Sequence, residues 1–171
     1  MAKGSGGTRT NSPHTGYNGA IQKINSKIKG DFTPKSVFGH TLTLGDNAGV
    51  SKLRSWLTGG TDPYDINFRK LDEVLSARGK EVDVKTSDIY PIQKYLNKEQ
   101  VARYIANPSQ NLSNRKLSVT GYRLPNGKVL LDDGHHRVAA QIINGSKTVK
   151  VRVVDINDYY ASKFFRSIIK K

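Results

Sequence analysis

The chain has 171 residues, of which 36% are hydrophobic, and it carries a formal net charge of +14. It contains no cysteine, which excludes disulfides, thiolate metal sites and cysteine nucleophiles. So strong a positive charge attracts polyanions, most often nucleic acid. There is no apolar run of the roughly 18 residues that a transmembrane helix needs, and the first residues lack the apolar segment of a signal peptide. We therefore expect no membrane association, and a location in the cytoplasm or within a particle assembled there.

The first half of the chain is predicted to be an arm followed by helices. Residues 1–19 are rich in Gly, Ser, Thr and Asn, so we expect a flexible arm that becomes ordered where a protein assembly holds it. Residues 20–80 are predicted to be a mostly helical, basic region. Apolar residues recur at helical spacing in IQKINSKI, AGVSKLRSWL and YDINFRKLDEVLSAR. The segment SVFGHTLTLGDN is predicted to be a strand or an extended loop.

Residues 81–155 are predicted to form a compact α/β unit in the order β–α–ββ–α–β. Strands are expected in EVDVKTS and TVKVRVV, and Asn126-Gly127 predicts a hairpin between LSVTGYRL and KVLLDD. Helices are expected in NKEQVARYIANP, capped by Asn97, and in HHRVAAQIING. Residues 156–171 are predicted to form a C-terminal helix. The whole chain is therefore expected to have an α+β fold.

The stretch LLDDGHHR has the residue types of a phosphate-binding turn. A strand that ends in Asp132 and Asp133 delivers the chain to Gly134, where a helix begins. The first N–H groups of a helix lack partners inside it, and with the helix dipole they attract anions. Glycine allows an anion to approach the backbone, and the planar fork of Arg137 suits phosphate oxygens.

Structural roles explain part of the same stretch. Asp133 is also a good N-cap residue. His135 falls near the centre of the apolar stripe of its helix, so it is predicted to be packed and bonded to a backbone carbonyl. His136 lies at the edge of that stripe, and Arg137 points away from it. Arg137 and His136 are therefore the preferred ligand contacts. Joint ligation of a transition metal by two adjacent histidines is disfavoured, because they diverge by about 100° on a helix.

Two motifs of the chain resemble the ParB/sulfiredoxin-like superfamily over roughly residues 81–154. One is Asp133-Gly134-His135-His136-Arg137, and the other is Ser87-Asp88-Ile89-Tyr90-Pro91-Ile92-Gln93 near the first strand of the unit. The resemblance implies a compact fold whose glycine turn binds nucleotide or nucleic-acid phosphates. It implies phosphate-binding roles for Gly134, His136 and Arg137, with Gln93 beside them.

Departures from the family pattern leave two hypotheses of different class. The absence of cysteine excludes sulfiredoxin chemistry, and only Gly134 and Arg137 match the motif of the partition proteins. The first hypothesis is a ParB-like nuclease or nucleotide-dependent phosphotransferase, with Mg²⁺ and a nucleoside triphosphate as cofactors. Its catalytic candidates are Asp133, His135 and His136, and its metal ligands are Asp132 and Asp133. The second is a non-catalytic nucleic-acid-binding or structural component of a nucleoprotein assembly, such as a phage particle.

Overall fold

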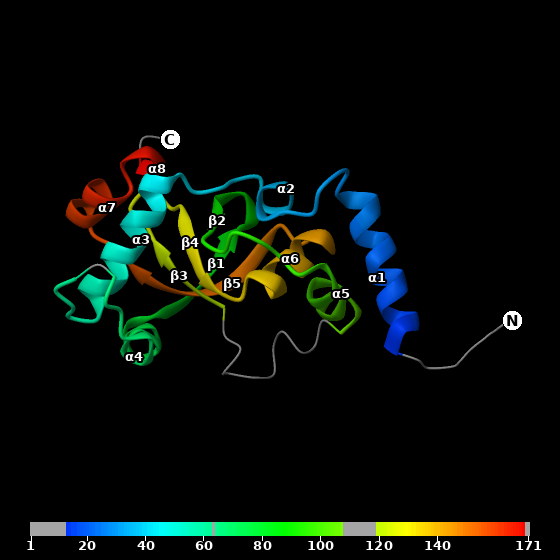
Figure 1. Ribbon diagram of the computed structural model, residues 1–171, viewed down its shortest axis with the longest axis horizontal. Coiled ribbons are helices and arrows are strands. Elements are labelled where there is room, and N and C mark those ends of the chain that lie inside the picture. The colour runs from blue at the N-terminus through cyan, green and yellow to red at the C-terminus, as the bar shows by residue number, and fades with distance from the viewer. Residues whose placement is uncertain (1–12, 63, 108–118, 170–171) are drawn as a thin grey trace, which may run out of the picture.

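The first part of the chain is helical in the computed structural model, which describes residues 13–62, 64–107 and 119–169 (Figure 1). Helix α1 (Pro13–Lys27) is followed by α2 (Pro34–Phe38), α3 (Leu44–Leu57) and α4 (Phe68–Arg78). Because α1 begins at Pro13, the last residues of the predicted arm are helical. The rest of that arm, residues 1–12, lies outside the described residues.

The predicted strand or loop SVFGHTLTLGDN contains no strand, and only its middle, residues 39–43, is a non-helical link. Its beginning belongs to α2 and its end to α3. Each of these helices starts with a capping box, in which Thr33 pairs with Ser36 and Thr43 pairs with Asp46. These reciprocal bonds satisfy the first amides of α2, which apolar periodicity did not indicate, and of α3, which begins before the predicted segment AGVSKLRSWL.

The second part of the chain contains a five-stranded mixed sheet, so the predicted α+β fold class is confirmed. The strands have the spatial order β1-β5-β3-β4-β2. Their partners alternate between antiparallel (β1 with β5, β3 with β4) and parallel (β3 with β5, β2 with β4). The hairpin predicted at Asn126-Gly127 joins β3 to β4, and Gly127 there has φ +89°. The bounds of the strands are β1 (Lys80–Lys85), β2 (Ile89–Pro91), β3 (Thr120–Arg123), β4 (Val129–Asp133) and β5 (Thr148–Asp155).

Four further helices follow or separate these strands. Helix α5 (Lys98–Ala106) is capped by Asn97 as predicted, and α6 (His135–Ile143) follows β4 directly. The predicted C-terminal helix is two short helices, α7 (Asp158–Phe164) and α8 (Arg166–Ile169), separated at Phe165. No helix in the described ranges has the length and apolar character required to cross a membrane.

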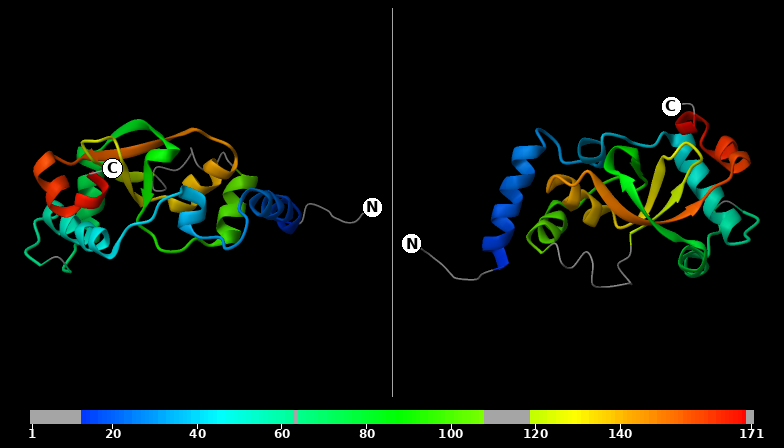
Figure 2. Two further views of the ribbon diagram at one scale, coloured as in Figure 1. Left: turned by 90° about the horizontal axis from the view of Figure 1, so that it is seen from above. Right: turned by 180° about the vertical axis from the view of Figure 1, so that it is seen from behind.

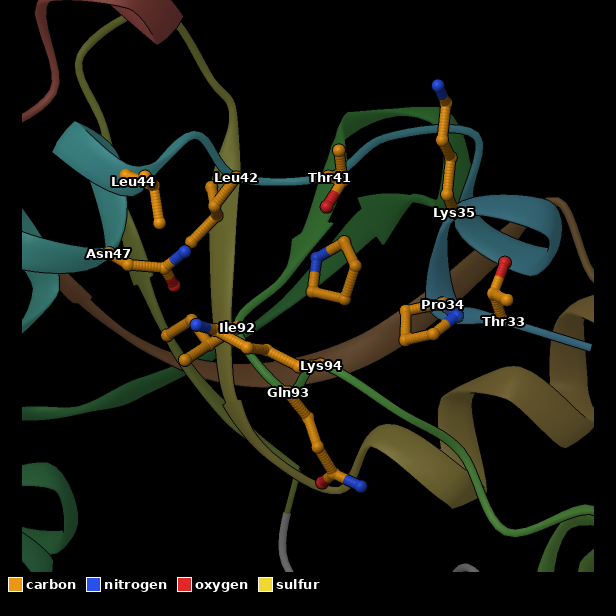
Figure 3. A pocket seen from close by; sticks show the side chains of 11 residues that line it. Thr33, Pro34, Lys35, Thr41, Leu42, Leu44, Asn47, Ile92, Gln93 and Lys94 are labelled. Atoms are coloured by element: carbon orange, nitrogen blue, oxygen red, sulfur yellow. The ribbon is translucent and has the colours of Figure 1, made fainter.

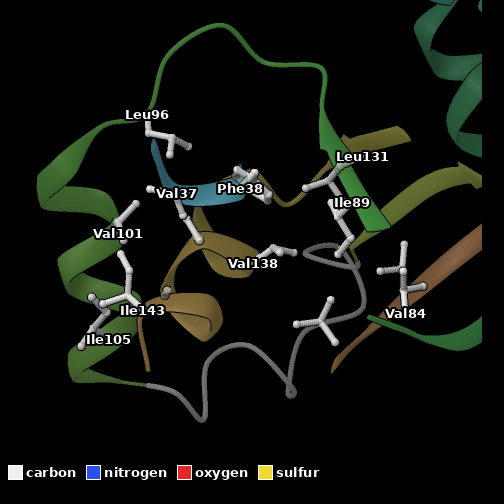
Figure 4. Packing of buried hydrophobic residues seen from close by; sticks show 14 of the residues in the cluster. Val37, Phe38, Val84, Ile89, Leu96, Val101, Ile105, Leu131, Val138 and Ile143 are labelled. Carbon is white, nitrogen blue, oxygen red and sulfur yellow. The ribbon is translucent and has the colours of Figure 1, made fainter. Parts of the chain in front are cut away.

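Two hydrophobic clusters lie on opposite faces of the sheet. Helices α1, α2, α5 and α6 contribute to one cluster, and α3, α4, α7 and α8 contribute to the other. Alternation along β4 sends Val129 and Leu131 into the first cluster and Leu130 into the second. Figure 2 shows helices at both ends of the sheet, and Figure 4 shows α2 and α5 packed around Val138 of α6. Helices from the first 80 residues thus cover both faces of the sheet that carries the Gly134 turn.

Candidate functional site

The Gly134 turn lies at the carboxyl end of β4, beside the carboxyl end of β2. These two strands are parallel neighbours, with Pro91 opposite Leu131. The loop after β2, residues 92–97, therefore leaves the sheet at the same edge as the turn after β4. In open α/β sheets, ligands bind at such edges, outside the carboxyl ends of the strands.

Gly134 has a conformation that favours glycine. Its φ of +93° lies in the left-handed region, and a Cβ at this position would lie 2.9 Å from Cγ2 of Val119. The prediction that Asp133 is the N-cap of α6 is wrong, because Gly134 occupies that position and makes no side-chain cap bond. Asp133 instead accepts a hydrogen bond from the Gly134 amide at 2.8 Å, so this amide already has a partner.

His135 fastens the loop after β2 to the start of α6. Its Nε2 accepts hydrogen bonds from the backbone amides of Ile92 (2.9 Å) and Gln93 (3.1 Å). The side chain is 3% exposed, which confirms the prediction of a packed histidine, but its partners are two amides and not a carbonyl. Burial lowers the pKa of His135 to about 4, although the Asp132 carboxylate opposes this shift. The ring is therefore neutral at pH 7 and acts as an acceptor.

His136 holds the other end of the same loop. Its Nε2 accepts a hydrogen bond from the Asn97 amide at 3.0 Å, and burial lowers its pKa. Asn97 is also the N-cap of α5, since its side chain accepts a hydrogen bond from the Gln100 amide. The two histidines thus fix residues 92–97 against the first turn of α6. The sequence predicts acid–base roles for both histidines and a phosphate-binding role for His136, because nothing in the local sequence indicates that they accept bonds from a segment about 40 positions earlier.

Gln93 is half-buried, and its side chain turns back on its own loop. Its backbone amide donates to His135, and its side-chain Nε2 donates to the Tyr95 carbonyl at 2.7 Å. The predicted role in phosphate binding would require this amide group to exchange Tyr95 for a ligand. Gln93 lies beside the turn, but its present contacts stabilise the loop.

Arg137 is buried, with 4% of its surface exposed, so the prediction that it points away from the buried face of α6 is wrong. The buried face is wider than the apolar stripe because α6 packs against α5 and α2 as well as the sheet. Burial lowers the pKa of Arg137, and the nearby Tyr104 and Asp133 oppose this shift. Its positive charge therefore lies within the first turn of α6, near Tyr104 of α5.

The predicted metal pair does not converge. The Asp133 carboxylate accepts a hydrogen bond from the Gly134 amide, whereas the Asp132 carboxylate is bonded to residues of α3 and β3. The Oδ1 of Asp132 accepts hydrogen bonds from Arg54 Nη2 (2.6 Å), Arg54 Nε (3.0 Å) and the Tyr122 hydroxyl (2.7 Å). Among the described residues there is no group of three or more His, Asp or Glu side chains that could hold a metal ion. A Mg²⁺ held jointly by Asp132 and Asp133 does not fit this arrangement.

A pocket of about 310 Å³ adjoins the loop after β2. Its walls come from α2, the link between α2 and α3, the first turns of α3, and residues 91–94. Figure 3 shows Asn47 and Lys94 directed toward the pocket, whereas Lys35 and Gln93 extend away from it. Two lysines and no acidic residue line it. The sequence does not indicate this pocket, because its lining comes from segments far apart in sequence, and four of its eleven residues lie in the predicted strand or loop.

Comparison with known proteins identifies no relative: no family model, no curated protein and no solved structure matches this chain. The resemblance to the ParB/sulfiredoxin-like superfamily therefore depends on the two motifs alone.

Proposed function

We propose that the chain is a ParB-like module that binds the phosphates of a nucleotide or a nucleic acid at the Gly134 turn. The observation that carries this proposal is the pair of hydrogen bonds from Ile92 and Gln93 to His135. They join the two segments on which the family resemblance depends, at the carboxyl ends of two parallel strands. Two motifs more than 40 positions apart thus contribute to one site.

The electrostatics of the turn favour an anion. Helix α6 is nine residues long, and its first-turn amides have no acceptor within the helix. Arg137 adds a positive charge that burial leaves poorly solvated, and a desolvated cation gains from an anion placed close to it. Asp133 is the opposing charge, and a phosphate that approaches the helix must pass beside it. We expect Arg137 to act mainly through its charge under the turn, since little of its surface is exposed.

Binding has better support than catalysis. A general acid or base needs a nitrogen that can exchange protons with the substrate, and Nε2 of both histidines is bonded to backbone amides. Asp132 is bonded to Arg54 and Tyr122, which leaves Asp133 as the exposed carboxylate of the motif. A nuclease or phosphotransferase would need a different arrangement of these groups. Binding without turnover also suits a component of a nucleoprotein assembly in the cytoplasm.

The Arg137→Gln variant tests the proposal. Glutamine keeps a polar side chain but removes the positive charge, so we expect at least a tenfold loss of affinity for pyrophosphate or a nucleoside triphosphate. Isothermal titration calorimetry with each ligand measures this loss, and thermal melting verifies that the variant is folded. The matched control is Arg123→Gln, which removes the same charge on β3 beside Asp155. Failure of the wild-type chain to bind any phosphate ligand, or an equal loss in both variants, would contradict the proposal.

A further inference from the structure

Two segments that are far apart in sequence each carry an excess of basic side chains. Residues 18–45 and 92–107 together carry seven basic and two acidic side chains. Residues 62–88, which include α4 and β1, carry five basic and seven acidic side chains. Basic and acidic side chains are therefore unevenly distributed among these parts of the sequence.

The fold brings the two basic segments together. Helix α1 packs against α5, and α2 packs against α6 and β2, so these helices form one end of the molecule (Figures 1 and 2). The Lys98 ammonium on α5 donates to the side-chain oxygen of Asn25 on α1. Lys35 of α2 and Lys94 of the loop after β2 line the same pocket. We call this surface the basic face and define it by its six lysines, Lys23, Lys27, Lys29, Lys35, Lys94 and Lys98.

Carboxylates of the described residues do not neutralise the basic face. The ion pairs between described residues involve Arg54, Lys80, Arg123, Lys128 and Lys150, and none involves a lysine of this face. Lys23 and Lys98 donate to the neutral side-chain oxygens of Asn144 and Asn25, which leaves their charge uncompensated. Five of the six lysines are exposed, and Lys98 is half-buried. Clustered, solvated lysines of this kind release counterions when they meet a polyanion.

We propose that the basic face is a nucleic-acid-binding surface continuous with the Gly134 turn. Ile92 and Gln93 line the pocket beside Lys35 and Lys94, and the same two residues donate their amides to His135. One loop is therefore shared by the pocket and the turn, and a phosphate backbone that lies across the face reaches both. This inference deepens the proposed function, on which it rests, by naming a nucleic-acid strand as the partner in preference to a free nucleotide.

The pocket adds polar and apolar contacts to the positive charge of the basic face. Its polar lining includes Thr33, Thr41 and Asn47, which can bond phosphate or sugar oxygens. Its apolar lining includes Leu42 and Leu44, and Leu44 is 84% exposed. Such a combination accommodates a sugar–phosphate backbone with a sugar or base against the leucines. Binding by charge alone would not require a pocket with this lining.

Two double charge reversals with the same change in net charge test the proposal. One is Lys35→Glu with Lys94→Glu on the basic face, and the other is Arg69→Glu with Lys70→Glu on α4. Fluorescence anisotropy with labelled single-stranded and double-stranded oligonucleotides, over a salt series, gives the affinity. We expect the first double variant to lose at least tenfold in affinity and its salt slope to fall by about 2, one unit for each lost phosphate contact. The α4 variant should lose threefold or less.

The outcomes separate this inference from the proposed function. Equal losses of affinity in the two double variants would contradict binding at the basic face, because net charge alone would then explain the affinity. Binding to phosphatidylserine vesicles as tight as to oligonucleotides, lost through the same two lysines, would overturn nucleic acid as the partner. If the Arg137→Gln variant kept its full oligonucleotide affinity while the Lys35/Lys94 variant lost it, the Gly134 turn would be excluded as a binding site and the basic face supported. Thermal melting of each variant distinguishes these results from unfolding.

Discussion

Replacing Asp132 with alanine is expected to lower the free energy of unfolding by about 3–5 kcal/mol, the range for breaking a buried ion pair. Asp132 is the common acceptor for the Arg54 guanidinium and the Tyr122 hydroxyl. The Arg54 and Asp132 side chains are only 18% and 9% exposed, and Tyr122 is fully buried. Removing the carboxylate therefore leaves a cation and a hydroxyl without the partner that compensates for their burial. Urea denaturation, followed by circular dichroism, measures the change.

Asp155→Ala is the matched control for that experiment. Asp155 also pairs with two cations, Lys80 and Arg123, but its side chain is 49% exposed. Exposed ion pairs stabilise by roughly 1 kcal/mol or less. The Asp132 variant should therefore be much less stable than the Asp155 variant. Similar losses in the two variants would mean that the Arg54–Asp132–Tyr122 network does not fasten α3 to the sheet.

Acidification from pH 6.5 to pH 4 is expected to remove about 3 kcal/mol of stability through His135, at about 1.4 kcal/mol per pKa unit. Burial lowers the pKa of His135 from 6.5 to about 4. Over this interval the unfolded chain binds a proton that the folded chain does not, so the free energy of unfolding falls as the pH falls. His136 acts in the same direction, because burial also lowers its pKa. Urea denaturation at a series of pH values measures the slope.

His135→Gln isolates the contribution of this histidine. The glutamine side-chain oxygen can accept the Ile92 and Gln93 amides but does not titrate, so the slope between pH 6.5 and pH 4 should be markedly reduced. Hydrogen bonding to Arg123 lowers the pKa of Asp155 to about 2. Asp155 therefore loses its contribution to stability only below about pH 4, outside this window. An unchanged slope in the glutamine variant would show that His135 is not the titrating group. His135→Ala should be destabilised at every pH, because it leaves two buried amides without an acceptor.

The sequence predicted those features of the fold that depend on neighbouring residues. Asn126-Gly127 indicated the hairpin, Asn97 indicated the start of α5, and Gly134 marked the turn before α6. Each signal consists of a few adjacent residues whose backbone preferences are strong. Capping boxes at Thr33 and Thr43 are equally local, but the apolar pattern between them resembled a strand. The periodicity therefore missed α2 and the start of α3, although α3 ends at Leu57 as it indicated.

The site itself depends on contacts between distant segments, which no local pattern contains. Arg54 meets Asp132 across 78 positions, and His135 meets Ile92 across 43. The helical wheel of α6 located one buried stripe correctly, and His135 was packed as predicted. It failed for Arg137 because a helix enclosed by α5, α2 and the sheet is buried on more than one side. The two carboxylates resembled a metal pair only because they are adjacent in sequence, although they bond to different parts of the structure.

The most direct test of phosphate binding at the Gly134 turn is a titration of the ¹⁵N-labelled chain with pyrophosphate, followed by amide chemical shifts at constant ionic strength. Gly134 and Gly145 are left-handed glycines at opposite ends of α6, with φ of +93° and +95°, and so provide an internal comparison. We predict that the amides of Gly134, His135, His136 and Arg137 shift and saturate, while the Gly145 amide stays in place. Unshifted amides at the Gly134 turn, or shifts of equal size at Gly145, would contradict a phosphate site at the start of α6.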